Sequence, residues 1–149
     1  MIQEGYPITD NTVLPINRYN AAGGVVIWKS KVLVLYRKLR NDFRLPKGHI
    51  EPDETPLAAA IREIGEESGY VDLHLRADLG AEVVDFERGG RRIIRNEHYF
   101  IMEVPGEPRQ IAHEEDRDPL WVGWDEALNL LTFEAEREWV RRARSVTGG

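Results

Sequence analysis

The segment from residue 48 to residue 70 constrains the fold of this chain more than any other, because it predicts one helix with a defined start and end. Thr55 followed by Pro56 is typical of an N-cap and the first helical residue. Gly69 is typical of the position just past a helix end. Between them, apolar residues recur at spacings of three and four, which predicts one stripe facing the core: Leu57, Ala60, Ile61 and Ile64.

The last turns of this predicted helix are acidic. Glu63, Glu66 and Glu67 lie at positions i, i+3 and i+4, so they share one face. A helix C-terminus disfavours negative charge by roughly 0.3–1 kcal/mol per group, and like charges at this spacing add ~0.2–0.5 kcal/mol each. Arg62 offsets about one such increment. A solvated acidic surface is one explanation of this pattern. A divalent cation held by carboxylate oxygens is the other, and it would remove the conflict.

The same segment resembles the Nudix box, G-x5-E-x7-R-E-U-x-E-E-x-G-U, in which U is a bulky apolar residue. The last U position holds Tyr70, an aromatic residue in place of the usual aliphatic one, which should affect packing behind the helix rather than chemistry. The resemblance favours metal binding over a solvated acidic face. Eight positions of the motif carry the required residue at the required spacing: Gly48, Glu54, Arg62, Glu63, Ile64, Glu66, Glu67 and Gly69.

The resemblance implies a metal-dependent pyrophosphohydrolase, and it assigns roles to the residues that match. It implies that Glu63 and Glu67 bind Mg²⁺, with Mn²⁺ as a possible substitute, together with the backbone carbonyl of Gly48. Glu66 would either join these ligands or act as the general base. Arg62 would orient the carboxylates.

Two further acidic positions follow from the same resemblance. Glu54 would brace the loop before the helix or bind a more distant metal ion. A late acidic loop in the family often adds one ligand or base, and Glu115 is our candidate because its spacing before Trp121 matches relatives best. A solvated charged loop is an equal expectation for each of the three acidic residues there: Glu114, Glu115 and Asp116.

The residues before the box indicate a substrate class. Residues 45–51 resemble the Pro-Lys-Gly-His sequence of dinucleoside polyphosphate hydrolases and diphosphoinositol polyphosphate phosphohydrolases, and residues 98–100 are similar to the same branch. Lys47 and His49 would meet phosphate oxygens, which suits a chain of four or more phosphates. We therefore expect a dinucleoside polyphosphate substrate such as diadenosine tetraphosphate. A nucleoside triphosphate, ADP-ribose or another nucleotide sugar, capped RNA, and a catalytically silent nucleotide-binding module remain alternatives.

Two more side chains are candidates for substrate binding. Arg37 ends an apolar run and would help to steer a polyanion. Tyr99 would stack on a nucleobase, although filling the core is the more usual role of an aromatic residue in a strand.

Length and composition limit the remaining possibilities. At 149 residues the chain is long enough for one domain with a real core, so we expect a single domain over residues 1–149. The absence of cysteine excludes disulfides, thiol catalysis and Cys-based zinc sites. A net charge of −6 and the lack of a long apolar segment argue against nucleic-acid and membrane binding. We expect a cytoplasmic protein with a small nucleotide partner, either a monomer or a homodimer.

Hydrophobic patterns predict an α/β layered fold, which the resemblance refines to the Nudix fold, a mixed β-sheet sandwiched between α-helices. The clearest hairpin signals are residues 21–28 with 31–37, and residues 82–87 with 91–95 around Gly89-Gly90. Residues 1–17 would form an irregular arm or an edge strand. The other expected elements are strands at 71–75, 99–104 and 121–124, a loop at 105–119, a helix capped by Asp125 through Leu131, and a helix capped by Thr132 to about Arg144.

Overall fold

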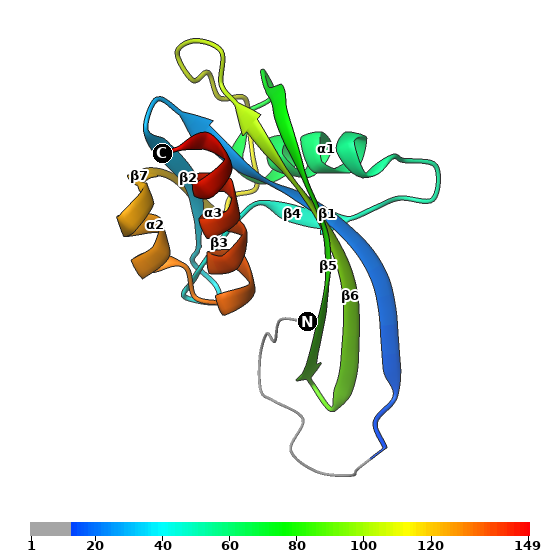
Figure 1. Ribbon diagram of the computed structural model, residues 1–149. Coiled ribbons are helices and arrows are strands. Elements are labelled where there is room, and N and C mark those ends of the chain that lie inside the picture. Colours follow the sequence, from blue (N-terminus) through cyan, green and yellow to red (C-terminus); the bar gives the residue numbers. More distant parts are fainter. Residues whose placement is uncertain (1–12) are drawn as a thin grey trace.

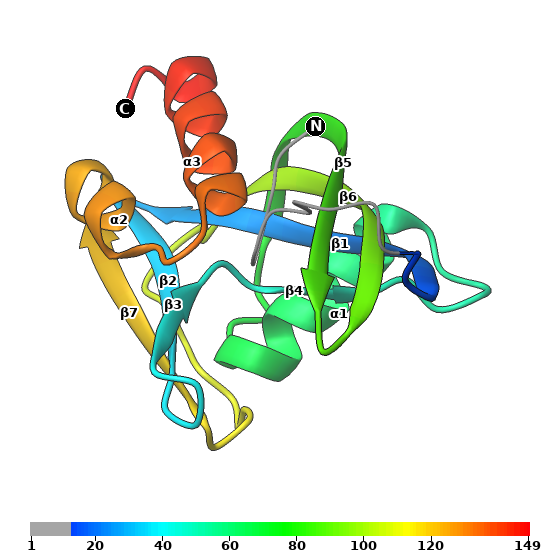
Figure 2. The same cartoon turned by 90° about the horizontal axis from the view of Figure 1, so that it is seen from below.

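The computed structural model describes residues 13–149, in which one mixed seven-stranded sheet lies between helices (Figure 1). Helix α1 covers one face of the sheet, and α2 and α3 cover the other (Figure 2). This is the Nudix fold that the sequence predicts. The elements are β1 (Ile16–Trp28), β2 (Lys31–Arg37), β3 (Asp42–Arg44), β4 (Lys47–His49), α1 (Pro56–Ser68), β5 (His74–Arg88), β6 (Arg91–Glu103), β7 (Arg117–Gly123), α2 (Trp124–Leu130) and α3 (Glu134–Thr147).

Helix α1 begins and ends where its capping residues predict. The Thr55 hydroxyl accepts a hydrogen bond from the Ala58 N–H at 3.1 Å. Gly69 adopts φ +82°, and its N–H donates to the Gly65 carbonyl at 2.9 Å. The buried stripe is narrower than predicted, because Ile61 is 37% exposed while Ala60 and Ile64 are fully buried.

Both predicted hairpins are present. Strands β1 and β2 pair antiparallel at Trp28 and Lys31, across a turn in which Lys29 has a positive φ. Strands β5 and β6 pair up to Arg88 and Arg91, and the positive φ of both turn glycines explains the Gly-Gly sequence there.

Strand β1 organises the sheet. All of β1 except its last residue pairs in parallel with β6, from Ile16 with Arg92 to Ile27 with Glu103. Its middle also pairs antiparallel with β4, the strand that carries Gly48. A Cβ atom on Gly23 would lie 2.5 Å from the Pro46 carbonyl oxygen, so a glycine is required where these two backbones approach. The parallel pairing places residues 16 and 17 in a strand, while residues 1–12 lie outside the described part of the chain.

Several predicted boundaries differ from the structure, and four of them have a local reason. Strand β5 starts at residue 74 and continues through residues 76–81, which separate two predicted strands. A β-bulge at Gly80 shifts the pairing register there and lets the strand continue. Strand β7 starts at residue 117, so the loop is shorter than predicted, and an edge position tolerates Pro119. Helix α2 is capped by Gly123 and not by Asp125. Helix α3 is capped by Phe133, because the Thr132 hydroxyl instead accepts the Phe43 N–H at 2.9 Å.

The core is divided between the two faces of the sheet, because successive strand residues point to opposite sides. Against α1 lie Ala22, Val26, Leu33, Leu35, Phe100 and Met102, and against α2 and α3 lie Val25, Ile27, Val32, Val34, Tyr99 and Ile101.

No helix in residues 13–149 is long and apolar enough to cross a membrane.

Gly69→Ala should destabilise the fold more than Gly80→Ala. Both positions have a positive φ, which costs an L-residue roughly 1–2 kcal/mol. A Cβ at residue 69 would also lie 2.4 Å from the Ile111 carbonyl oxygen, whereas nothing lies within 4 Å of one at residue 80. Urea unfolding of the two variants measures this difference. Equal losses of stability would show that the contact with Ile111 contributes nothing.

Candidate active site

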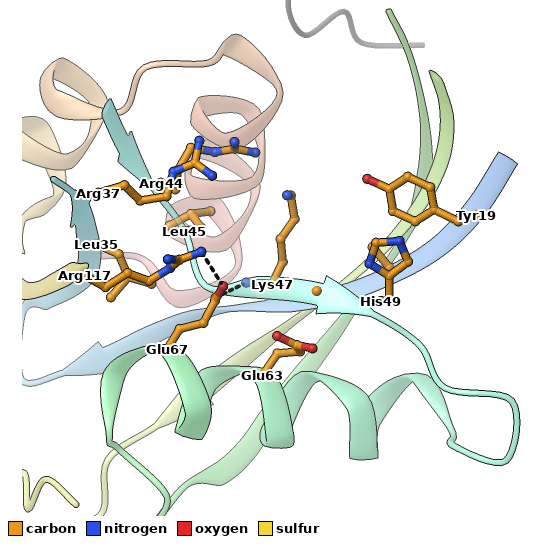
Figure 3. A pocket seen from close by; sticks show the side chains of 12 residues that line it. Tyr19, Leu35, Arg37, Arg44, Leu45, Lys47, His49, Glu63, Glu67 and Arg117 are labelled. Carbon is orange, nitrogen blue, oxygen red and sulfur yellow. Dashed lines mark hydrogen bonds and ion pairs between the residues drawn. The ribbon is translucent and has the colours of Figure 1, made fainter. Parts of the chain in front are cut away.

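A cavity of about 300 Å³ lies between the sheet and the C-terminal half of α1, where β4 crosses the helix (Figure 3). Two carboxylates of α1 face four cationic side chains across it. Most of the residues that the sequence singled out are among those that line it. The lining residues are Tyr19, Ala21, Leu35, Arg37, Arg44, Leu45, Lys47, Gly48, His49, Glu63, Glu67 and Arg117.

Glu67 is the most deeply buried of the three helix carboxylates, with only 10% of its side chain exposed. Its Oε1 accepts the Lys47 N–H at 3.0 Å, and its Oε2 lies 3.4 Å from Arg117 Nη2. Burial raises the pKa of Glu67 to about 7, and the positive charge of Arg117 opposes this shift only in part. The fold therefore holds a carboxylate where its charge is disfavoured.

Glu63 lies directly beside the backbone of Gly48. A Cβ on Gly48 would be 2.1 Å from the Glu63 Cδ, so any other residue would displace this carboxylate. Burial raises the pKa of Glu63, while the hydrogen bond from Arg62 Nη1 at 2.8 Å lowers it. The glycine of the motif thus provides the space that the carboxylate occupies.

Arg62 connects the glutamates of the motif. Its guanidinium makes a bidentate pair with Glu54 at 2.7 and 2.8 Å, and it also donates to the His49 carbonyl at 2.9 Å. These contacts hold the pKa of Glu54 well below its usual range. Glu66 contacts Arg62 more loosely, at 3.3 Å, and half of its side chain is exposed.

The three arginines of the cavity come from three strands. Arg37 of β2 and Arg117 of β7 are direct cross-strand partners, and carboxylates accompany both of these like charges. Arg37 is held by a bidentate pair with Asp42 at 2.7 and 2.5 Å. Arg44 of β3 is held by the buried carboxylate of Glu136. Figure 3 shows Arg37 and Arg44 at the same end of the cavity.

Lys47 projects into the middle of the cavity (Figure 3). Burial, together with the positive charges of Arg44 and Arg95, lowers the pKa of Lys47 to about 8.

The opposite end of the cavity is aromatic. The rings of Tyr19 and His49 are stacked, with centroids 4.1 Å apart and planes 18° apart (Figure 3). Arg95 Nη1 donates a hydrogen bond to the Tyr19 hydroxyl at 3.2 Å, which fixes the orientation of the Tyr19 ring. Of the predicted substrate-binding residues, Arg37, Lys47 and His49 therefore all line one cavity.

Four predicted site residues do not line the cavity. Arg62 and Glu66 lie next to it on α1, where Arg62 contacts Glu63, whereas the other two lie elsewhere. Tyr99 is fully buried on the α3 side of the sheet, where its ring stacks on Trp139 at 4.8 Å, so the prediction that it stacks on a nucleobase is wrong. Glu115 is exposed, and its backbone carbonyl accepts from Lys38 Nζ at 3.3 Å. Its carboxylate does not line the cavity, because the loop turns its neighbour Glu114 toward α1 instead.

The loop before β7 caps the end of α1. The N–H groups of Ile111 and Glu114 donate to the carbonyls of Gly69 and Glu66 at 2.8 and 3.0 Å, and Gln110 Nε2 donates to the Ser68 carbonyl at 3.0 Å. These bonds satisfy carbonyls that a helix end leaves unpaired. The loop therefore fixes the turn of α1 that carries Glu66 and Glu67.

Sequence reasoning missed three residues of the cavity: Tyr19, Arg44 and Arg117. Tyr19 and Arg117 reach the site through strand pairing between distant segments, for which local periodicity contains no signal. Arg44 lies on β3, which pairs with the neighbouring strand β2. For Arg44 a weak signal existed, since it stands three residues before Lys47 in the segment that leads into the box.

The residues of the cavity fit a hard divalent cation, although no three His, Asp or Glu side chains within residues 13–149 already form a metal-binding cluster. Glu63 and Glu67 offer carboxylate oxygens, the donors that Mg²⁺ and Mn²⁺ prefer. Burial raises the pKa of both carboxylates, so the positive charges around them do not fully stabilise their ionised forms. The lack of a side chain at Gly48 lets the Glu63 carboxylate lie at the cavity wall. A bound cation would supply the missing charge.

Comparison with known proteins shows the family. The NUDIX domain matches residues 18–143, and the chain belongs to this family. Divalent metal ions are generally needed by hydrolases of this family.

Relatives within the family differ in what they act on. The chain is 27% identical over 150 residues to an 8-oxo-(d)GTP phosphatase of Mycolicibacterium smegmatis, covering 91% of this chain and 45% of that protein. It is 29% identical over 130 residues to an RNA pyrophosphohydrolase of Gluconobacter oxydans, covering 79% and 75%. The chain spans about half the length of several curated relatives that it matches. A solved structure of a C. elegans Ap4A hydrolase has the same fold, with a TM-score of 0.70 at 22% identity over 88% of this chain and 98% of that one.

Gly48→Ala should weaken the binding of a divalent cation, because the new Cβ would push the Glu63 carboxylate out of its position. We expect the Kd for Mn²⁺, measured by electron paramagnetic resonance, to rise roughly 10-fold or more, as when a metal ligand loses its support. Gly106→Ala is the matched control, because nothing lies within 4 Å of a Cβ there. An unchanged Kd in Gly48→Ala would contradict the assignment of Glu63 as a ligand.

Proposed function

We propose that this protein is a metal-dependent pyrophosphohydrolase that cleaves a phosphate anhydride in a nucleoside diphosphate-linked compound. One observation carries the proposal: Glu63 and Glu67 of α1 face Arg37, Arg44, Lys47 and Arg117 across a single cavity. Carboxylates suit metal ions, and a row of fixed cations suits a phosphate chain. The chain's membership of the NUDIX family supports the same reading.

Glu63 and Glu67, with the backbone carbonyl of Gly48, are the proposed ligands of Mg²⁺ or Mn²⁺. When bound, such an ion neutralises phosphate charge and lowers the pKa of a coordinated water. The protein's own groups position the substrate. Arg37 and Arg44 are already held by Asp42 and Glu136, so they lose little freedom when they meet phosphate oxygens.

Glu66 is the proposed proton acceptor. It is the most exposed of the three glutamates, and Arg62 contacts it without burying it. A water molecule attacks one phosphorus of the anhydride, Glu66 takes its proton, and the bond from that phosphorus to the bridging oxygen breaks. The leaving phosphate departs with the bridging oxygen and is protonated from solvent. Arg62 donates hydrogen bonds to both Glu63 and Glu66 and so keeps the two carboxylates in fixed positions relative to each other during this step.

The proposed substrate is a dinucleoside polyphosphate such as diadenosine tetraphosphate. Lys47 and His49 flank Gly48 and both line the cavity, so a longer phosphate chain meets more cationic and polar groups than ADP-ribose does. The arginines lie at one end of the cavity and the Tyr19–His49 stack lies at the other (Figure 3). The similarity of fold to the C. elegans Ap4A hydrolase is consistent with this choice.

A substrate panel tests the proposal. Purified protein with Mg²⁺ is expected to cleave diadenosine tetraphosphate with a higher kcat/KM than ADP-ribose, 8-oxo-dGTP or a 5′-triphosphorylated RNA, and EDTA should abolish turnover. Products are identified by chromatography. Turnover that survives complete chelation would contradict the metal-dependent mechanism. A higher kcat/KM for one of the other compounds would replace the proposed substrate and leave the reaction class standing.

Lys47→Ala should narrow the gap between the long and the short substrate. Lys47 projects into the cavity, and a charge-assisted hydrogen bond to phosphate is worth ~1.5–3 kcal/mol. We expect kcat/KM for diadenosine tetraphosphate to fall on the order of 10- to 100-fold, and that for ADP-ribose to fall less. Lys29→Ala, at an exposed lysine outside the cavity, is the control. An equal fall in kcat/KM for both substrates would show that Lys47 does not distinguish a long phosphate chain from a short one.

A further inference from the structure

A second cavity of about 500 Å³ adjoins the first at its arginine end. The two cavities share Arg37, which lines both. We call the second cavity the Phe133 pocket, after the aromatic side chain at the start of α3. Its lining residues are Arg37, Arg40, Asp42, Glu87, Arg88, Gly89 and Phe133.

The position of Phe133 is fixed by its neighbours. The guanidinium of Arg44, which lines the first cavity, lies over the Phe133 ring at 4.6 Å from its centroid. The preceding residue, Thr132, is bound to β3 by two hydrogen bonds with Phe43, one of 3.1 Å from its N–H and one of 2.9 Å to its hydroxyl. The ring is therefore a preorganised flat surface next to a phosphate-facing arginine.

The two cavities differ in charge. In the first, four cations face two carboxylates, whereas the Phe133 pocket combines three arginines with the carboxylates of Asp42 and Glu87. The Phe133 pocket has one cation fewer than the first cavity, and the Asp42 carboxylate that pairs with Arg37 lines the pocket itself. A second phosphate group would therefore lie against two carboxylates there. A planar group with polar edges is better suited, since it can stack on Phe133 and use both donors and acceptors at the rim.

We propose that the Phe133 pocket binds a nucleobase of the substrate, while the attached phosphates pass Arg37 and Arg44 to reach Glu63 and Glu67. This inference rests on the proposed function, because it takes the first cavity as the phosphate site. It explains why an aromatic residue stands at the helix start, a position where its side chain contributes no capping hydrogen bond. It also supplies the stacking surface that the buried Tyr99 cannot provide.

Equilibrium binding tests the pocket without requiring turnover. The probes are two triphosphate analogues whose bridging oxygens are replaced by CH₂ groups, one carrying adenosine and one without a nucleoside. Binding of each is measured by calorimetry in Mg²⁺. The wild type should bind the adenosine-bearing probe more tightly. Phe133→Ala should weaken that probe on the order of 10-fold, the usual effect of losing one base–aromatic stack, and leave the bare probe unchanged.

Three further variants make the result decisive. Phe133→Tyr should keep the preference for adenosine, because it keeps a ring. Phe133→Leu should lose the preference while it keeps the apolar packing on Arg44, which guards against a folding defect in the alanine variant. Tyr19→Ala, at the opposite end of the first cavity, should retain the preference.

Several outcomes would overturn the inference. These are equal affinity of the wild type for both probes, equal weakening of both probes by Phe133→Ala, and loss of the preference in Tyr19→Ala but not in Phe133→Ala. Because no probe is hydrolysed, failure of the Phe133 pocket is distinct from failure of the proposed hydrolase activity, which the substrate panel measures.

Discussion

The buried carboxylate of Glu67 is the constraint on which the site depends. It stands in the last turn of α1, where the helix dipole disfavours negative charge, and burial raises its pKa to about 7. The fold compensates only in part, through the Lys47 N–H from β4 and the guanidinium of Arg117 from β7. Both partners come from outside the helix. The positions of β4 and β7 therefore decide whether the helix carboxylates form a site.

Those two strands are placed by β1 and β2. Strand β4 lies on β1 only because Gly23 lets the backbones approach, and β7 follows β2 in a register that sets Arg117 opposite Arg37. Burial raises the pKa of both Glu63 and Glu67, so their charges cost stability unless a cation accompanies them. A bound cation would remove this conflict, which is the physical reason to regard the cavity as a site rather than as a packing defect.

Sequence reasoning predicted the helix, its caps and both hairpins, since each of these depends on residues close together in the chain, such as Thr55 and Gly69. It also predicted Lys47 and His49 as candidates for substrate binding next to Gly48, and both line the same cavity as Glu63. It could not predict the parallel pairing of β1 with β6 or the register of β7, which depend on distant segments. Arg117 and Tyr19 were missed for that reason. Tyr99 was misassigned because strand alternation does not reveal which face of a sheet a helix covers.

The most direct test of this account is urea unfolding of the wild type and Glu67→Gln at pH 8, with EDTA and with Mg²⁺. When folding raises the pKa of a carboxyl group, the free energy of unfolding falls as the pH rises from the pKa of the unfolded state through that of the folded state. The pKa of Glu67 in the folded protein is about 7, so at pH 8 its charge destabilises the protein almost fully. Without metal, Glu67→Gln should be more stable than the wild type, by ~1 kcal/mol. Mg²⁺ should stabilise the wild type and have little effect on the variant. A metal-free variant less stable than the wild type, or an equal gain from Mg²⁺ in both proteins, would contradict the claim that Glu67 is held for a cation.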